Sequence, residues 1–407
     1  MNQLDFEYIV QLRNEGHYSQ AMNLLEEFID YLEKQYTLNQ FNDSLPSDVI
    51  SQYAKALGQK AILFRYLGDI EQAKFYTLKA IPFAEQTQEV ELLGLLISDY
   101  GVYQYKSGNV EDAERNFKKA VQILESVDST NQLVIVKINY GCMLLHLGEF
   151  DQCIPLFKQT LKDLETKGDS VELGSLLTNL AYAYENIGKT ELALMTYIRA
   201  KESLFRINAI PMYVHSSINL VALYNEEEMF ELAKSILDEV EQYISTEELS
   251  NERIDYLINY IGYFLGIDAI DEAIRLLEEI STLDLTTIEP ESKVYMLSLW
   301  ARIYIRIGNI QEAKKYAELI QKDISTYSKP EIEPFLYWVR GKIAVLEQEY
   351  EWATKCCYKG LHECTFSKQG TKIFRDLEKL QSEIYSLMDD SKKSSFQFSH
   401  LTEITSE

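Results

Sequence analysis

A small residue recurs every 40 residues along most of this chain. Eight such residues share one phase: Ala73, Ala113, Cys153, Ala193, Ala233, Ala273, Ala313 and Ala353. A ninth copy begins at Ala21, 52 positions before Ala73, so 12 residues are inserted around 36–46. A fixed period of this length is typical of repeat proteins, in which each unit packs only against its neighbours. The repeat therefore constrains the fold more than any other feature of the sequence.

Each repeat predicts two helices joined by a tight turn, because apolar residues follow helical spacing on both sides of the turn. In six repeats a glycine stands where the first helix must end, and glycine adopts the left-handed conformation of a helix end at little cost. These are Gly16, Gly68, Gly108, Gly148, Gly188 and Gly308. Three other turns carry Glu228, Asp268 and Gln348 instead, so we expect more backbone strain there.

These spacings resemble the tetratricopeptide repeat (TPR) signature. That signature has a small residue, an aromatic residue three positions later, glycine at the turn, and then alanine, an aromatic residue and alanine in the second helix. The clearest match is at Ala181, Tyr184, Gly188, Ala193, Tyr197 and Ala200. The period here exceeds the roughly 34 residues usual in the family, so both helices should be longer. The chain looks like the long-repeat arrays of kinesin light chains, mitotic-spindle adaptors and bacterial peptide-pheromone receptors.

The resemblance implies an all-α, superhelical TPR solenoid of about nine helix pairs, closed by a C-terminal capping helix. We expect a degenerate N-terminal repeat at 1–36, an inserted loop at 37–50 and eight tandem 40-residue repeats at 51–368. A capping helix should follow at 369–390, because this stretch combines helical apolar spacing with a polar outer face. The polar, serine-rich residues 391–407 predict a disordered tail.

Charge and hydropathy exclude several function classes. The net charge is −25, from 39 basic and 64 acidic residues. Such a surface repels phosphate backbones and anionic lipids, which argues against direct binding to nucleic acid or membranes. No apolar run approaches the roughly 18 residues of a membrane span, and the first residues lack the layout of a signal peptide. With only five thinly spread cysteines, we expect a cytoplasmic protein with reduced thiols.

A polar residue also recurs every 40 residues, in the first helix of each repeat. This polar ladder comprises Gln59, Asp99, Asn139, Asn179, Asn219 and Asn259. An asparagine amide offers one donor and one acceptor group, which match a peptide unit of an extended chain. In the long-repeat arrays named above, asparagines at this phase hold the backbone of a bound peptide, so the resemblance implies this role for all four asparagines. The alternative is that these amides join neighbouring repeats to each other.

Residues three and seven positions after an asparagine share its helix face. After the last two asparagines these residues are small or acidic, namely Ala222, Glu226, Gly262 and Gly266. We therefore expect the groove to widen there, with Tyr182 and His215 at its flanks. Tyr182 would either anchor a ligand side chain or pack in the core.

Basic residues of the groove face gather at the two ends of the array. The early ones are Lys55, Arg65 and Lys106, and the late ones are Arg302, Arg306 and Lys342. Such a pattern would suit a ligand with acidic ends or a basic middle. Ordinary scatter of solvated charges is the alternative. On this basis Arg302 and Arg306 join the candidate binding residues.

The sequence carries no catalytic or nucleotide-binding motif of the GxGxxG, GxxxxGK[ST], HExxH or GxSxG type. Cysteines and a histidine cluster near the end of the array, but the spacing lacks the second half of a zinc site. This cluster comprises Cys356, Cys357, His362 and Cys364. Cys142 and His146 lie one helical turn apart, as a thiol and its base would, with no third orienting group in view. We expect no enzyme activity, no cofactor and no metal.

The sequence therefore predicts a non-catalytic TPR scaffold that binds a protein or peptide in its concave groove. The leading hypothesis is an adaptor or regulatory subunit that grips a segment of a partner protein, and an effector subunit encoded nearby would fit this role. One alternative is a receptor of the peptide-pheromone type that lacks a DNA-binding domain. A further alternative, from another class, is an enzyme with an active site between repeats.

Overall fold

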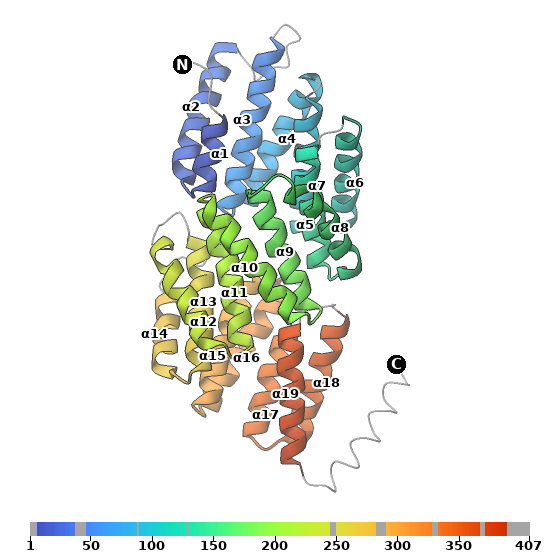
Figure 1. The fold of residues 1–407 in the computed structure, drawn as a ribbon. Helices are drawn as coiled ribbons and strands as arrows, with labels where there is room; N and C mark the ends of the chain where they lie inside the picture. Colours follow the sequence, from blue (N-terminus) through green and yellow to red (C-terminus); the bar gives the residue numbers. More distant parts are fainter. Residues whose placement is uncertain are drawn as a thin grey trace. The chain divides into compact units, whose positions relative to one another are not determined.

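The computed structural model describes residues 6–36, 46–87, 89–127, 130–244, 250–281, 290–327, 333–366 and 371–388. Over these residues the chain is all-α, as expected, and the helices follow one another as antiparallel pairs (Figure 1). The first ten helices are α1 (Phe6–Asn14), α2 (Tyr18–Tyr36), α3 (Ser47–Tyr66), α4 (Ile70–Thr87), α5 (Val90–Lys106), α6 (Val110–Glu125), α7 (Thr130–His146), α8 (Phe150–Glu165), α9 (Val171–Asn186) and α10 (Thr190–Arg206).

The array continues with α11 (Ile210–Glu226), α12 (Phe230–Val240), a 3₁₀ turn at Glu241–Tyr243, α13 (Ser250–Gly266), α14 (Ile270–Ser281), α15 (Pro290–Arg306), α16 (Ile310–Tyr327), α17 (Glu333–Leu346), α18 (Tyr350–Phe366) and α19 (Thr371–Leu387). Helices contact their partners within a pair, and first helices also contact first helices of the next repeat, as in α5 with α7 and α15 with α17. Each described helix of these pairs therefore belongs to a stack of repeats.

The repeat alanines explain the packing of the pairs. All nine small residues of this phase, from Ala21 to Ala353, have no exposed surface. A larger side chain would hold the second helix away from the first. The small residues that recur every 40 positions are therefore core residues at which the two helices of a pair pack closely. Glycines serve the same purpose on the first helices. A Cβ atom at Gly141, for example, would lie 2.2 Å from the buried ring of Phe157.

The turns inside the repeats form as predicted. All six turn glycines have positive φ, between 70° and 88°. Glu228, Asp268 and Gln348 adopt the same left-handed conformation, with φ of 58°, 63° and 63°. At Gln348 the amide of the next residue donates to the carbonyl oxygen of Ala344 at 2.8 Å, which is the hydrogen bond that closes a helix end. These three residues therefore adopt the left-handed turn conformation that glycine adopts in the other six repeats.

The start of helix α3 differs from the loop expected before it. Helix α3 begins at Ser47, inside the loop expected at 37–50, because Pro46 starts the helix and its carbonyl oxygen accepts from the amides of Val49 and Ile50. The expected end of that loop is therefore wrong. Residues 37–45 and the tail expected at 391–407 lie outside the described residues.

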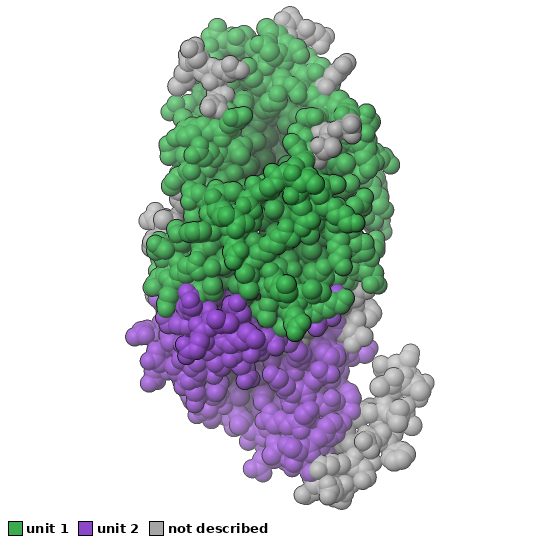
Figure 2. All heavy atoms as spheres, in the orientation of Figure 1, with its two compact units in different colours: residues 1–184, 189–220, 236–253 green, residues 185–188, 221–235, 254–407 purple. Residues whose placement is uncertain are grey.

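The chain divides into two compact units (Figure 2). Unit 1 comprises residues 1–184, 189–220 and 236–253, and unit 2 comprises residues 185–188, 221–235 and 254–407. Unit 1 has its main core between α1 and α5, around Tyr53, Leu57 and Leu96.

The core of unit 2 lies between α15 and α19. There α19 buries Ile373, Leu377, Leu380 and Ile384 against α17 and α18. This contact confirms the capping helix. Among the described residues, no helix is long and apolar enough to cross a membrane.

Candidate functional site

Unit 2 contains a cavity of about 420 Å³. Its walls come from the end of α11, from the middle and end of α13, from α15 and from the capping helix α19. Pockets that take small ligands have volumes of roughly 300–1,000 Å³. This cavity, called the unit 2 cavity below, is therefore large enough to hold part of a peptide.

The unit 2 cavity is lined by more basic than acidic side chains. The basic residues are Arg302, Arg306, Arg375 and Lys379, and the acidic residues are Glu226, Glu228 and Asp376. This composition differs from that of the chain as a whole, whose net charge is −25. A basic side chain of this wall that is not paired with a carboxylate favours a ligand that carries a negative group.

Arg302 is the most tightly packed of the basic residues in the cavity wall. Its Nη2 donates to Asp376 Oδ2, and its guanidinium lies 4.4 Å from the centre of the Trp338 ring. Its Nε is buried and donates to no acceptor among the described residues. The ring and the ion pair hold the guanidinium in one orientation while one of its N–H groups has no acceptor.

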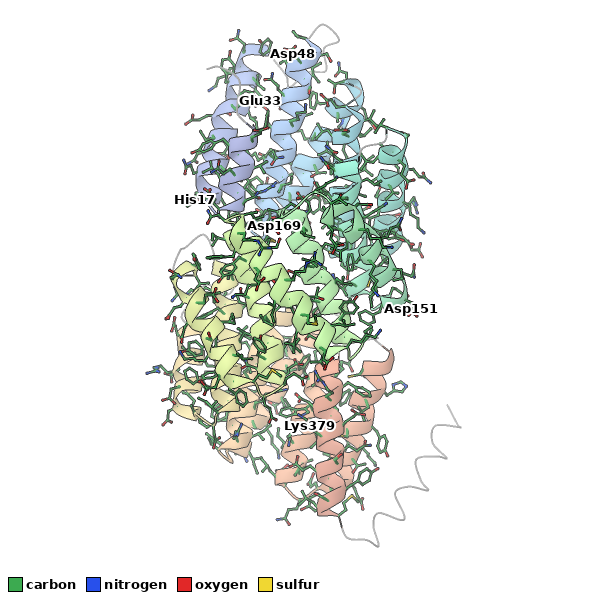
Figure 3. The ribbon with its side chains drawn as sticks, in the orientation of Figure 1. His17, Glu33, Asp48, Asp151, Asp169 and Lys379 are labelled. Atoms are coloured by element: carbon green, nitrogen blue, oxygen red, sulfur yellow. The ribbon has the colours of Figure 1, made fainter. Side chains whose placement is uncertain are left out.

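Arg375 lies next to Asp376 on α19 and forms ion pairs in which α19 supplies the basic residue. Its two terminal nitrogens donate to Glu226 Oε2 at 2.6 Å and to Glu227 Oε1 at 3.0 Å. Asp376 and Arg375 thus connect the capping helix to α15 and to the end of α11. Lys379 lies one turn further along α19 (Figure 3) and has no hydrogen bond or ion pair with the described residues.

Two glycines of α13 line the cavity but differ in what surrounds them. A Cβ atom at Gly262 would meet only Asn225 Nδ2, at 3.5 Å, so the missing side chain leaves open space. A Cβ atom at Gly266 would lie 2.2 Å from Phe230 Cε1, so the Phe230 ring fills that space. Of these two small residues, only Gly262 therefore leaves open space in the cavity. Gly266 is small because the Phe230 ring packs against it.

Three of the predicted site residues lie in the wall of this cavity: Asn259, Arg302 and Arg306. Arg306 Nε forms an ion pair with Asp268 Oδ1 at 3.0 Å, and its Nη1 donates to the carbonyl oxygen of Leu265 at 2.8 Å. Asn259 donates from Nδ2 to the carbonyl oxygen of Asp255 on its own helix, at 2.9 Å. The other five predicted residues belong to unit 1 and do not line the unit 2 cavity.

Two asparagines of the polar ladder join neighbouring repeats. Asn139 Nδ2 donates to Ser98 Oγ at 3.2 Å, and Asn179 Nδ2 donates to Cys142 Sγ at 3.0 Å. Each of these bonds connects two consecutive first helices. Asn219 instead contacts the His215 ring at 3.3 Å on its own helix. The amide groups of Asn139 and Asn179 therefore contribute to repeat packing, whereas those of Asn219 and Asn259 do not bridge repeats.

The first two positions of the ladder belong to a charged network in unit 1. Arg65 donates to Asp99 Oδ1 at 3.0 Å, and Arg13 donates to Gln59 Oε1 at 3.4 Å. Burial raises the pKa of the Asp99 carboxyl above its usual value, against the effect of the nearby arginines. Because these groups are already paired, this part of the ladder resembles a structural network more than an open binding surface.

The two flanking residues expected for the groove are both exposed. The Tyr182 side chain is 42% exposed, so it does not pack in the core. His215 is exposed as well and faces Asn219 on α11. Sequence reasoning missed Asn225, Arg375, Asp376 and Lys379, which complete the unit 2 cavity. The last three lie on α19 outside the 40-residue phase, so the repeat pattern holds no signal for them.

Several solved structures are similar to this architecture. No family model and no curated protein sequence matches the chain significantly. A Rap protein complexed with Competence and Sporulation Factor aligns with a TM-score of 0.55 and 13% identity, over 93% of this chain and 97% of its own. NprR in complex with its cognate peptide NprX gives 0.53 and 16%, over 79% and 90%. A tetratricopeptide repeat protein from Parabacteroides merdae gives 0.46 and 18%, over 70% and 96%.

The chain has the tetratricopeptide-repeat fold. In TPR terms, the unit 2 cavity lies on the first helices of three consecutive repeats, α11, α13 and α15, and the capping helix closes it. Helices that lie far apart in the sequence therefore contribute to one cavity.

The thiol groups of this TPR protein are poorly suited to catalysis. Burial raises the pKa of Cys142 to about 12, and Nδ1 of His146 contacts the carbonyl oxygen of Cys142 rather than its thiol. Cys356, Cys357 and Cys364 are buried free thiols, and His362 points to Glu363. Within the described residues no three metal-ligating side chains come together. A thiol with such a high pKa is a weak nucleophile at neutral pH.

Proposed function

We propose that this TPR protein binds an extended peptide segment along its first helices and acts by binding rather than by catalysis. The observation that carries the proposal is the unit 2 cavity, which combines amide groups with a fixed guanidinium. Two of its polar atoms, Arg302 Nε and Asn225 Oδ1, are buried without a partner among the described residues. Buried polar atoms in native proteins are nearly always satisfied, so these two are suited to a ligand.

The asparagines of the ladder divide into two functional groups under this proposal. Asn259, which lines the unit 2 cavity, would hold the backbone of the bound segment, because its amide Nδ2 donates only within its own helix among the described residues. Asn139 and Asn179 would mainly stabilise the stack through Ser98 and Cys142. Replacing Asn259 by alanine should lower ligand affinity by about 1 kcal/mol or more. The double replacement of Asn139 and Asn179 should instead lower the stability of unit 1.

The named ligands of two similar structures support a peptide as the occupant. The Rap protein is complexed with Competence and Sporulation Factor, and NprR is complexed with its cognate peptide NprX. We favour an adaptor or regulatory subunit in the cytoplasm, which takes a segment of a partner protein and has no direct contact with nucleic acid or membrane. An effector encoded nearby would be the natural partner.

A second candidate is a receptor for a short free peptide, without a DNA-binding domain. The size of the cavity favours it, since about 420 Å³ has room for a few residues and not for a helix. The two functions separate in one experiment. The tagged chain is purified from its native cells and the eluate is analysed by mass spectrometry. A stoichiometric protein supports the adaptor, whereas a peptide of a few residues supports the receptor.

Peptide binding itself is tested with the purified full-length chain and a random pentapeptide library, by affinity selection. Gly262→Leu should abolish selection, because its side chain enters the cavity without meeting any atom closer than 3.5 Å at Cβ. Gly262→Ala is the matched control, since it adds one carbon and leaves the cavity open. Equal selection by Gly262→Leu and the unchanged chain would remove the unit 2 cavity from the proposal.

A further inference from the structure

We propose that the unit 2 cavity is a carboxylate-binding subsite, and that Asp376 of the capping helix takes the place of the ligand carboxylate when no ligand is bound. This inference rests on the proposed peptide-binding function and names the chemistry of one part of the ligand. It is argued from the contacts of three groups: the Arg302 guanidinium, the Asp376 carboxylate and the Lys379 ammonium.

The Arg302 guanidinium is only half used by Asp376. The Nε and Nη2 groups of an arginine lie along one edge, where a carboxylate accepts from both at once. Asp376 accepts from Nη2 alone, and Nε is buried without an acceptor among the residues that the structure describes. A carboxylate that replaced Asp376 at this edge would make one hydrogen bond more. The Trp338 ring, 4.4 Å from the guanidinium, keeps that edge in place for the exchange.

The position of the ion pair allows Asp376 to leave. The side chains of Arg302 and Asp376 are 20% and 24% exposed, so water reaches the pair and weakens it. The apolar residues of α19, such as Leu377 and Leu380, pack against α17 and α18 independently of this pair. A rotation of the Asp376 side chain therefore frees Arg302 without moving the capping helix.

A second cation in the cavity also lacks an acceptor. Lys379 lines the cavity and has no partner among the described residues, whereas Arg306 and Arg375 are each paired with carboxylates. With Asp376 turned away, Arg302 and Lys379 are the two basic side chains of the wall without a carboxylate partner among the described residues. An anion can pair with both, and the Arg302 edge selects a planar carboxylate.

The ligand of this subsite should also carry a hydrogen-bond donor. Asn225 Nδ2 donates to the carbonyl oxygen of Asn259 at 3.0 Å, while Asn225 Oδ1 is buried and accepts from no donor of the described residues. A carboxylate next to an N–H group would satisfy both Arg302 and Asn225. Peptides offer this combination in two ways, at a free C-terminus and at an acidic side chain.

The test uses one pentapeptide selected from the random library and isothermal titration with the full-length chain. Arg302→Gln should weaken binding about tenfold, because it removes a charge-assisted pair. Lys379→Gln should weaken it about threefold, without a folding cost, because Lys379 has no partner in the described part of the chain. Asp376→Asn should strengthen binding about threefold or more, since it removes the competing carboxylate. A misfolded variant could not give this gain.

Lys314→Gln serves as the control, because it removes an exposed ion pair of unit 2 with Glu347 that lies outside the cavity. The source of the carboxylate is found by amidating the peptide C-terminus and, separately, by replacing Asp or Glu with Asn or Gln. One of the two changes should weaken binding as much as Arg302→Gln does.

The outcomes separate this inference from the function on which it rests. If peptides bind but neither neutralisation nor Asp376→Asn changes their affinity, the subsite is wrong and peptide binding stands. If the library yields no bound peptide, both the subsite and the short-peptide form of the function are wrong.

Discussion

Gly262 and Gly266 lie one turn apart on α13, and the same substitution should have opposite effects at the two positions. At Gly262 an added Cβ has normal contact distances, and its nearest neighbour is 3.5 Å away. Alanine is about 0.8–1 kcal/mol more favourable than glycine inside a helix. Gly262→Ala should therefore stabilise unit 2 by up to about 1 kcal/mol.

At Gly266 the added Cβ would lie 2.2 Å from Phe230 Cε1 and 2.6 Å from Cζ. Carbon atoms in contact are about 3.5–4.0 Å apart, so the ring must move by more than about 1 Å. Overpacking of this kind costs about 1–3 kcal/mol. Since Gly266 is the last residue of the helix, little propensity is gained in return. Gly266→Ala should destabilise unit 2 by about 1–2 kcal/mol.

Urea unfolding followed by circular dichroism measures both changes, and hydrogen exchange of peptides from α13 locates them in unit 2. The expected difference between the two variants is about 2 kcal/mol. If Gly266→Ala were as stable as Gly262→Ala, the Phe230 ring would not be packed as described. The different reasons given for the two glycines would then be wrong.

The remaining predictions concern strain, pH and thiols. Gln348→Gly should stabilise the chain by about 0.5–1 kcal/mol in a thermal melt, because glycine relieves the left-handed strain at φ 63°. Asp268→Gly should gain less, because it also loses an ion pair with an arginine. Hydrogen bonds from Arg206 lower the pKa of Asp169 to about 2, so their stabilising effect is complete above the unfolded pKa near 4 and is lost as the pH falls towards 2. The difference in melting temperature between the unchanged chain and Asp169→Asn should accordingly shrink between about pH 5 and pH 2. Burial raises the pKa of Cys142 to about 12, so iodoacetamide at about pH 8 should label it far more slowly in the native chain than in urea.

The sequence predicts the fold well because the repeat alanines are also the residues of closest packing. One phase identifies the helix pairs, the turns and even the strained turns at Glu228, Asp268 and Gln348, since each follows from local backbone and packing needs. The loop expected at 37–50 ends too late for a local reason too. A proline such as Pro46 occurs both in loops and directly at the start of a helix, so it does not show which of the two follows.

The candidate site could be predicted only in part. Asn259, Arg302 and Arg306 line the unit 2 cavity and share the repeat phase. Arg375 and Asp376 come from outside that phase, and their partners lie up to 149 positions away in the chain. Contacts over such separations depend on how repeats stack, which a periodic pattern does not specify. Likewise, the pattern cannot tell Gly262 from Gly266, since the difference lies in the Phe230 ring.

The two ion pairs of the capping helix also depend on the number of repeats in unit 2. Arg375 reaches Glu226 and Asp376 reaches Arg302, so the two ion pairs measure the distance from α19 back to α11 and to α15. A duplicated or deleted 40-residue repeat between them would keep every alanine in phase and still separate both pairs. An array with one repeat more or fewer would therefore need other residues on α19 to form the same two ion pairs and the same cavity.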